Sequence, residues 1–269
     1  LYFDPRRFLS FCYTFRRSYR QARDMIAHSV RPVVIGTGGF VAAPVCMAGH
    51  RLGVPVVLVN VDISPGRANR LSARWADEIF VQFEGGEREF GSRRDRVSVV
   101  GCPLRNGFAN ADRRRAIQTL GLDANKRVLL ITGASSGSMR INEAVCMLLP
   151  KLEAFAETWQ IVHLTGLENL DDVTRRYESA RIDHRVVSYY DEMPDLLAAA
   201  DLVVGRSGAV SVAEYAVAGV PSICMPYPHH KDRHQYRNAG KLVEVGAAII
   251  VDDVADAEDR AGWLWEELE

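Results

Sequence analysis

The chain has 269 residues, of which 48% are hydrophobic and 25% charged, and its 33 Lys and Arg nearly balance its 34 Asp and Glu. This composition excludes a disordered chain, a collagen-like chain and a strongly basic nucleic-acid binder, so we expect no nucleic-acid partner. The length fits one large or two modest domains, at roughly 150 residues each. Because the formal net charge is −1, any attraction to phosphates or to a membrane must be local.

Cysteine usage and hydropathy exclude further classes of protein. The five cysteines are an odd number and never occur in C-x-x-C spacing, so we expect neither a disulfide framework nor a zinc site, as is typical of the reducing cytosol. No apolar run approaches the roughly 18 residues that a bilayer-spanning helix needs. Because Leu1 is not a natural start residue, we expect the chain to be part of a longer protein.

The first segment, residues 2–28, interleaves basic and aromatic side chains at helical spacing. Two interpretations stay open: a surface helix whose aromatic face packs on the sheet, or an amphipathic helix that lies on an anionic membrane face. Both hold if part of the helix is covered. The residues concerned are Arg6, Arg7, Arg16, Arg17, Arg20 and Arg23, with Phe3, Phe8, Phe11, Phe15 and Met25.

Short apolar runs then recur along the chain, separated by stretches long enough for crossover helices. Runs without polar alternation are typical of parallel strands buried on both faces, so we predict an α/β fold with two doubly wound, Rossmann-like parallel sheets. We expect a first domain at 1–104, a connector at 105–126 and a second domain at 127–269. The ten predicted strands are 32–35, 55–59, 78–81, 96–100, 127–132, 160–164, 185–188, 201–205, 221–225 and 247–251.

Three strand-to-helix turns are rich in glycine and serine: 36–40, 133–137 and 205–209. Small residues let a phosphate approach the backbone, and a helix N-terminus attracts an anion. None of the three matches the P-loop or G-x-G-x-x-G pattern. Each could be an ordinary tight turn, but three together favour a phosphate-bearing ligand.

Glu214 follows Ser207 by seven residues, or two helical turns, which predicts that both project from one face of a helix. A carboxylate there could accept hydrogen bonds from ribose hydroxyls while Ser207 and nearby N–H groups meet a phosphate. The alternative is an ordinary acidic residue near a helix N-terminus.

The segment 226–239 is a polar loop that enters a helix. Gln235 and Asn238 share a helix face and offer the donors and acceptors that sugar hydroxyls require. Because adjacent histidines diverge, we expect no metal site at His229, His230 and His234. The chain has no D-x-D pair for a magnesium-bound diphosphate, so Arg206, Arg105 and helix ends are expected to neutralise that charge.

The stretches 36–44, 101–105, 133–142, 206–214 and 230–239 occur in the order and spacing of the MurG-type transferases, and the sequence resembles that family from its first residues to about Val251. These enzymes move N-acetylglucosamine from UDP-GlcNAc to lipid-linked muramyl pentapeptide in peptidoglycan synthesis. The resemblance implies a two-domain GT-B fold, no metal or other cofactor, and a cytoplasmic location on the inner membrane face, which the basic first helix would contact.

The resemblance also implies roles for individual residues. Glu214 would accept the ribose hydroxyls, Tyr190 would read uracil through its backbone, and Gln235 and Asn238 would contact the sugar. The expected donor-binding set is Arg105, Ser135, Tyr190, Ser207, Gly208, Ala209, Val210, Glu214, Gln235 and Asn238. The expected acceptor-side set is Thr37, Gly38, Gly39, Phe40 and Asn69.

The sequence departs from the family pattern in three places. It lacks the glycine-rich first loop with its histidine, the usual base, so the first domain is expected to be incomplete and the catalytic residue is unassigned. It also stops short of the final helices. The family's His-Glu-Gln-Asn motif is Val-Asn-Val-Asp at 59–62, although Asn69 is kept. Alternatives are therefore another lipid or polysaccharide acceptor, or a UDP-sugar-binding fragment without catalysis.

Overall fold

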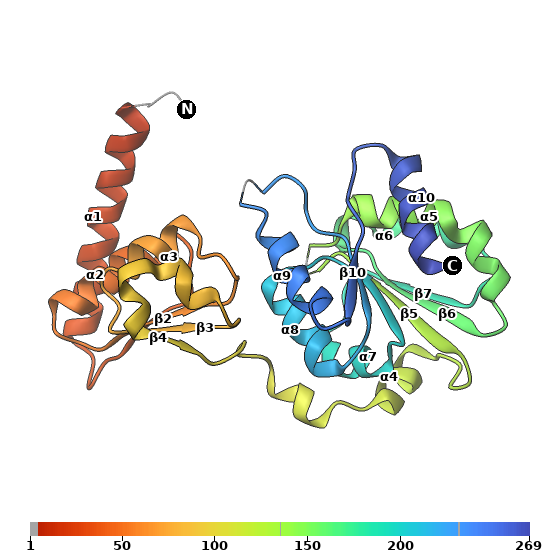
Figure 1. The fold of residues 1–269 in the computed structure, drawn as a ribbon, viewed down its shortest axis with the longest axis horizontal. Coiled ribbons are helices and arrows are strands. Elements are labelled where there is room, and N and C mark those ends of the chain that lie inside the picture. The colour runs from red at the N-terminus through yellow and green to blue at the C-terminus, as the bar shows by residue number, and fades with distance from the viewer. Residues whose placement is uncertain (1–4, 135, 231) are drawn as a thin grey trace. The chain divides into compact units, whose positions relative to one another are not determined.

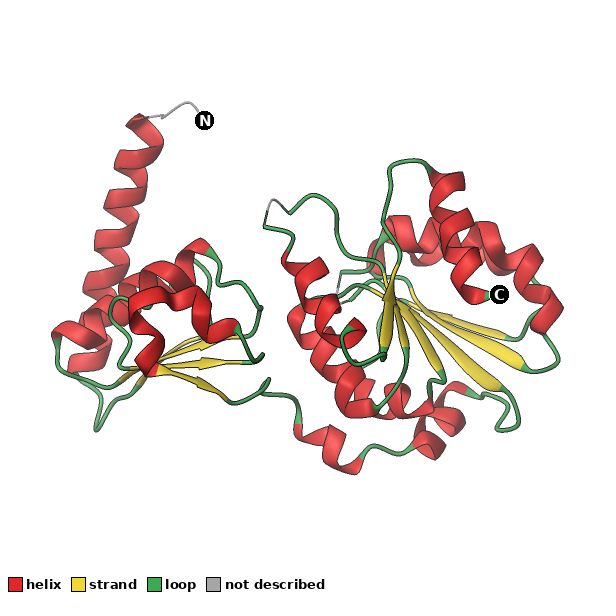
Figure 2. Ribbon diagram, viewed as in Figure 1, coloured by secondary structure: helices red, strands yellow, loops and turns green. Residues whose placement is uncertain are grey.

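The computed structural model describes residues 5–134, 136–230 and 232–269 and divides the chain into two compact units, Leu1–Cys102 and Pro103–Glu269 (Figure 1). Both units consist of parallel β-strands with helices packed on the sheet (Figure 2). All ten predicted strands are confirmed, because each predicted run overlaps an observed strand. Within the described ranges, no helix combines the length and apolar character needed to cross a bilayer.

The first unit has a four-stranded sheet in the order β1-β2-β3-β4. Each crossover steps to the next strand in the same direction, so the described strands of this unit show no reversal of order. The strands are β1 (Val34–Gly36), β2 (Val56–Asn60), β3 (Glu78–Val81) and β4 (Val97–Val99), and the helical elements are α1 (Pro5–Ala27), α2 (Ala42–Arg51), α3 (Arg67–Ser72) and η1 (Gly86–Arg96).

Helix α1 is covered along only part of its length. Ala22 is buried and Ile26 packs against the core of Val34, Cys46 and Val56. The turns nearer the N-terminus expose Phe8, Leu9, Phe11 and Tyr13, and Figure 1 shows them standing clear of α2 and α3. The expected packing through an aromatic face is wrong for Phe8, Phe11 and Met25, which are exposed, because the helix contacts the unit through Ala22 and Ile26 instead. Contact of the segment with a membrane stays a prediction.

The second unit has a six-stranded sheet in the order β10-β9-β8-β5-β6-β7. The order reverses between β5 and β8, which is the predicted double winding. The strands are β5 (Arg127–Thr132), β6 (Trp159–Leu164), β7 (His184–Val187), β8 (Leu202–Gly205), β9 (Ser222–Cys224) and β10 (Ala248–Ile250). The helical elements are η2 (Asn106–Asn110), α4 (Arg113–Leu120), α5 (Met139–Leu152), η3 (Glu153–Phe155), η4 (Leu167–Asn169), α6 (Leu170–Tyr177), α7 (Met193–Ala199), α8 (Ala209–Ala218), α9 (His234–Val243) and α10 (Ala257–Leu268).

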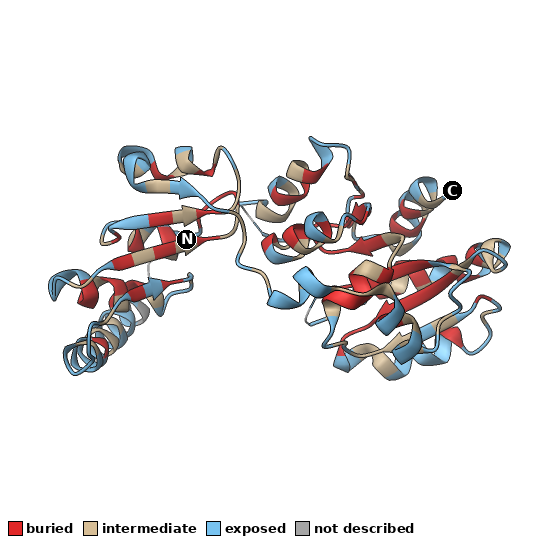
Figure 3. Cartoon of the chain, turned by 90° about the horizontal axis from the view of Figure 1, so that it is seen from below, coloured by how far each residue is buried: buried red, intermediate tan, exposed pale blue. Residues whose placement is uncertain are grey.

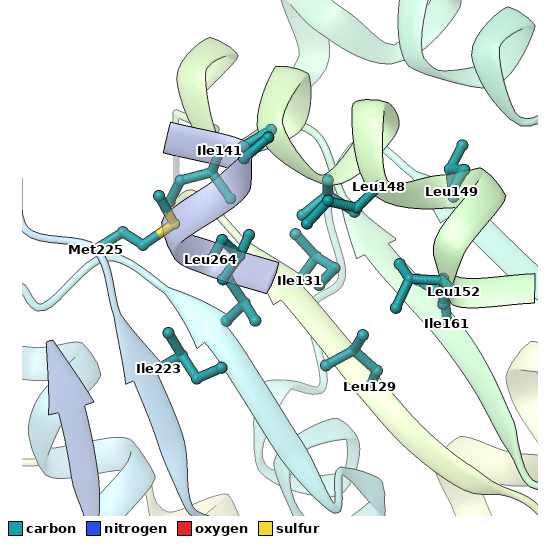
Figure 4. Close-up of a cluster of buried hydrophobic side chains, with 14 of the residues drawn as sticks. Leu129, Ile131, Ile141, Leu148, Leu149, Leu152, Ile161, Ile223, Met225 and Leu264 are labelled. Atoms are coloured by element: carbon teal, nitrogen blue, oxygen red, sulfur yellow. The ribbon is translucent and has the colours of Figure 1, made fainter. Parts of the chain in front are cut away.

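The core of the second unit lies where α5 and α10 cover one face of the sheet (Figure 4). Leu129 and Ile131 of β5 pack there against α5 and against Leu264 of α10, while Val128 and Leu130 are buried on the opposite face. Burial on both faces explains why this strand has no polar alternation in the sequence. Figure 3 shows the buried residues concentrated along the strands.

Candidate functional site

A pocket of about 250 Å³ lies at the carboxyl edge of the second sheet, where the strand order reverses. Thr132, Leu164 and Gly205 are level with one another in the register of β5, β6 and β8, and they mark this edge. Ligands of open α/β sheets bind at such a reversal. The lining residues are Arg105, Thr132, Ala134, Leu164, Ser188, Tyr189, Met193, Val210, Ser211, Glu214 and Tyr215.

Helix α8 supplies one wall of the pocket through Val210, Ser211 and Glu214. Gly208 is the N-cap of this ten-residue helix, and as a glycine it has no side chain with which to cap the first turn. The N-terminal end of α8, with its positive dipole end, lies at the pocket rim through Val210 and Ser211. This arrangement suits an anionic group.

Glu214 and Arg105 face the pocket together. Glu214 is half-buried, and burial raises the pKa of its carboxyl, while the Arg105 guanidinium opposes that shift. Arg105 donates from Nη1 to the Asp191 carbonyl oxygen at 2.9 Å. The pKa of Arg105 is raised mainly by a hydrogen bond with Tyr189 and also by the Glu214 charge. A partly desolvated carboxylate thus lies near a fixed positive charge.

Arg206 does not belong to the pocket, and the expectation that it neutralises a diphosphate is wrong. Its side chain is buried, with Nη2 2.7 Å from Ser138 Oγ and 2.8 Å from Asp253 Oδ2. Its Nη1 donates to the Met225 carbonyl oxygen at 2.8 Å. The inward-facing guanidinium thereby joins the loops that follow β5, β9 and β10.

Ser207 and Asn238 do not line the pocket either, and both side chains are fully buried. Asn238 Nδ2 donates to the Ser207 carbonyl oxygen at 3.4 Å. Gln235 is half-buried, and its Oε1 accepts from the Tyr227 amide at 2.9 Å. The structure therefore does not bring these three side chains to the pocket lining.

The remaining donor-side predictions fall around the pocket. Val210 lines it, Gly208 caps α8, and Ala209 is buried in the first turn. Tyr190 is half-buried, while its neighbour Tyr189 lines the pocket. Ser135 lies outside the described residues.

Sequence reasoning missed several lining residues, notably Thr132, Ser188, Tyr189 and Ser211. Thr132 ends β5, and Ser188 directly follows β7. A polar residue at the carboxyl end of a buried parallel strand is a signal that could have identified these two.

Glycines of the second loop have a structural explanation. A Cβ at Gly133 would collide with the backbone of Gly137 and Ser138, and one at Gly137 would collide with the Thr165 carbonyl oxygen. Gly137 also has φ +74°. These glycines permit close packing of loops, as the ordinary tight-turn interpretation expects.

The acceptor-side residues lie in the first unit and form one cluster. Thr37 to Phe40 make the loop after β1, with φ +114° at Gly38 and +76° at Gly39, and the Phe40 side chain is exposed. Asn69 is buried next to that loop, because a Cβ at Gly38 would lie 3.1 Å from its Oδ1. Asn69 Nδ2 donates to Asn60 Oδ1 at 2.8 Å, which connects the loop to the altered stretch 59–62.

The histidines at the start of α9 are closer together than expected. His230, Asp232 and His234 place their ligand atoms within 4.8 Å of one another, and such a group could hold a metal ion. The expected divergence of adjacent histidines does not apply to His230 and His234, which are four residues apart.

Comparison with known proteins agrees with this geometry. Residues 5–81 match the model of the glycosyltransferase family 28 N-terminal domain, and residues 128–259 match that of the C-terminal domain. The crystal structure of Acinetobacter baumannii MurG has a TM-score of 0.70 at 25% identity, and covers 100% of this chain and 72% of that chain. A UDP-GlcNAc 2-epimerase from Neisseria meningitidis, bound to UDP-GlcNAc, shares the fold with a TM-score of 0.66 at 13% identity, over 96% of this chain and 74% of that chain.

Two relatives carry the name UDP-N-acetylglucosamine–N-acetylmuramyl-(pentapeptide) pyrophosphoryl-undecaprenol N-acetylglucosamine transferase. The protein from Desulforamulus reducens is 37% identical over 243 residues, which cover 88% of this chain and 65% of that protein. The protein from Halothermothrix orenii is 34% identical over 259 residues, covering 94% and 70%. The chain thus spans about two thirds of the length of these relatives.

The two parallel-sheet units have the GT-B-like fold of nucleotide-sugar glycosyltransferases. Within that class, the chain belongs to the glycosyltransferase family 28 transferases that include MurG.

Proposed function

We propose that this protein transfers N-acetylglucosamine from UDP-GlcNAc to a lipid-linked muramyl pentapeptide, as the names of its relatives state for them. The observation that carries the proposal is the pocket at the strand-order reversal, which Glu214, Arg105 and the first turn of α8 line together. A nucleoside diphosphate sugar can use a carboxylate for its ribose hydroxyls, and a fixed cation and a positive helix end for its diphosphate.

In the proposed complex, the ribose hydroxyls donate to the Glu214 carboxylate. The diphosphate lies against the first turn of α8 and Arg105, with the uracil near Tyr189 and the backbone of Tyr190. Attack of the acceptor hydroxyl oxygen at the anomeric carbon breaks the bond from that carbon to the UDP oxygen and inverts the centre. The hydroxyl proton passes to a base, for which no residue is assigned, and UDP leaves with the bonding electron pair. The negative charge that develops on UDP is stabilised by groups that are already oriented.

The transfer does not require a metal ion in this proposal. Glu214 is the single carboxylate among the described residues that line the pocket, and one carboxylate is a poor basis for a magnesium diphosphate site. Arg105 and the dipole of α8 supply the compensating charge instead.

The acceptor approaches from the cytoplasmic face of the membrane, and α1 contributes to membrane contact through its exposed aromatic and basic residues. The loop 37–40 with Asn69 is the proposed acceptor-side surface. The second candidate is transfer to a different lipid acceptor, because the altered stretch 59–62 is hydrogen-bonded to the proposed acceptor-side surface. Asn60 Oδ1 accepts from Asn69, and Asn60 Nδ2 donates to the Asp62 carbonyl oxygen.

Calorimetric titration with UDP, UDP-GlcNAc and ADP tests the donor site. We expect the uridine ligands to bind, ADP to bind at least tenfold more weakly, and Glu214→Ala to abolish measurable UDP binding. Glu266→Ala, an exposed residue of α10, is the matched control and should bind as the original chain does. A folded chain that binds no uridine ligand contradicts the proposal.

Parallel transfer assays with the lipid-linked muramyl pentapeptide and with other polyprenyl-diphosphate sugars test the acceptor. Uridine-ligand binding together with transfer to another acceptor alone would favour the second candidate.

A further inference from the structure

The start of α9 contains a chain of three polar side chains that the proposed transfer does not use. His230 Nδ1 lies 2.9 Å from His234 Nε2, and His234 Nδ1 lies 2.7 Å from Asp232 Oδ1. None of the three lines the donor pocket. His230 belongs to the loop after β9, while His234 is the first residue of α9.

The distance between the two imidazoles matches one particular coordination geometry. Two nitrogens bound to one ion at about 2.05 Å lie roughly 2.9 Å apart at a 90° angle, but about 3.3 Å apart at the tetrahedral angle. The corresponding ring centres, about 1.1 Å beyond each nitrogen, lie roughly 4.5 Å apart at 90°. The observed values are 2.9 Å between nitrogens and 4.4 Å between ring centroids.

Asp232 fixes the orientation that a metal ligand needs. Its carboxylate accepts the hydrogen of His234 Nδ1, which leaves the lone pair of Nε2 directed toward His230. A carboxylate behind a histidine is the usual support of a metal-bound imidazole. Without an ion, a hydrogen of His230 Nδ1 occupies the space between the rings; with one, that hydrogen resides on Nε2.

We propose that His230 Nδ1 and His234 Nε2 bind one divalent transition-metal ion at neighbouring coordination positions, with Asp232 orienting His234 and water filling the remaining positions. Imidazole selects borderline ions such as Ni²⁺, Cu²⁺ and Zn²⁺ over Mg²⁺, and right-angled positions favour Ni²⁺ and Cu²⁺.

The ion would tie the loop after β9 to the first turn of α9. Arg233, between the two ligands in sequence, has φ +48°, a left-handed conformation that non-glycine residues rarely adopt. A metal link across this residue would stabilise that conformation. This inference rests on the positions of His230, Asp232 and His234 and not on the proposed transfer.

Titration of the tag-free full chain with Ni²⁺ tests the site by calorimetry. We expect one Ni²⁺ per chain, a raised Tm in its presence, and no detectable Mg²⁺ binding. His230→Gln and His234→Gln should each weaken Ni²⁺ binding at least tenfold, and Asp232→Asn should weaken it tenfold to a hundredfold. His229→Gln, the neighbouring exposed histidine, should bind within twofold of the original chain.

Circular dichroism of each variant separates loss of the site from loss of the fold. His230→Gln alters an exposed loop residue, so it keeps the test decisive if His234→Gln unfolds the chain. A folded original chain without Ni²⁺ binding overturns the proposal, and so does unchanged binding in folded His230→Gln. Equal affinity for Mg²⁺ would likewise overturn the assignment to imidazole.

Discussion

At the scale of single residues, burial and ligand binding act in opposite directions on the ionisation of the Glu214 carboxyl. Burial raises the pKa of its carboxyl, so the ionised form is costly in the free protein, whereas hydrogen bonds from ribose hydroxyls favour that form. Glu214→Gln removes the buried charge. We expect UDP affinity to fall roughly tenfold or more, the loss typical of a charge-assisted hydrogen bond, while Tm is not lowered. Calorimetry and a thermal melt measure the two effects.

The same residue predicts a pH dependence of binding. If UDP requires ionised Glu214, affinity declines as pH falls through the raised pKa, and the decline begins at a higher pH than for an ordinary glutamate. UDP also takes up a proton in this range, so the meaningful quantity is the difference between the original chain and Glu214→Gln. UDP titrations from pH 8 to pH 5 measure it, and identical profiles for both proteins would contradict the role of Glu214.

The predicted helical spacing between Ser207 and Glu214 is wrong, for a physical reason. Helix α8 begins at Ala209, so Ser207 precedes the N-cap and does not follow helical spacing. The orientation of the Arg206 side chain could not be predicted from the sequence either, since its partners Ser138, Met225 and Asp253 come from three distant segments. Local sequence shows that a polar residue follows a strand but not which way its side chain turns.

The close contact of His230 and His234 was not predicted from the sequence either. His230 and His234 are four residues apart with Asp232 between them, a spacing readable in the sequence. The expected divergence concerns the adjacent pair His229 and His230, and the left-handed conformation of Arg233 between the two close histidines is not predictable from spacing.

At the scale of elements, the strands were the most predictable part of the fold. Strand β5 is buried at five of its six positions, and a strand covered on both faces must be apolar throughout. Helix α1 was less predictable, because its pattern is amphipathic over its whole length while the unit covers only its second half. Coverage depends on what lies beside a helix, which spacing within the helix does not record.

The junction of β6, α5 and α6 contains a buried polar network that predicts acid sensitivity. His163 is fully buried between Tyr177 Oη and Asn142 Oδ1, each at 3.0 Å, and Asn142 Nδ2 donates to the Thr165 carbonyl oxygen. Burial lowers the pKa of His163 to about 3. The unfolded chain binds a proton below about pH 6.5 that the folded chain does not, so stability falls as pH decreases from there toward 3.

Denaturant unfolding at pH 7, 6 and 5 measures this effect. We expect His163 to contribute up to about 1.4 kcal/mol of lost stability per pH unit in that window. His163→Gln removes this contribution. Tyr177→Phe is the matched control: it costs about 1 kcal/mol at every pH through one lost hydrogen bond, but it retains the imidazole and its pH slope. A slope that is the same with and without His163 would refute the assignment.

The exposed basic residues of α1 predict binding to anionic membranes. Each arginine near such a surface contributes about 1 kcal/mol, so replacing four by glutamine should reduce sedimentation with anionic vesicles by more than half. The matched control removes four arginines from exposed positions of the second unit and should sediment as the original chain does. The test set is Arg6, Arg16, Arg17 and Arg20, and the control set is Arg114, Arg175, Arg176 and Arg181. Equal sedimentation of both variants would exclude a role for α1.

At the scale of the whole molecule, the two units differ in how much of a core each one carries. The second unit has a six-stranded sheet with an extensive cluster of buried residues under α5 and α10, whereas the clusters seen among the described residues of the first unit are small. The sequence indicated two parallel-sheet domains through the polar stretch at 105–126. In the structure that stretch contains η2 and α4, and α4 packs against α7.

This difference predicts that residues 103–269 fold alone and keep the donor site. All lining residues of the pocket lie between Arg105 and Tyr215, and the aspartate that holds Arg206 is also in this unit. We expect the isolated unit to melt cooperatively and to bind UDP within about threefold of the full chain. Calorimetry on the two proteins measures this, with Glu214→Gln in each as the matched control. Loss of UDP binding from a folded isolated unit would mean that the first unit supplies part of the donor site, whereas equal binding would assign nucleotide recognition to the second unit and leave the acceptor to the first.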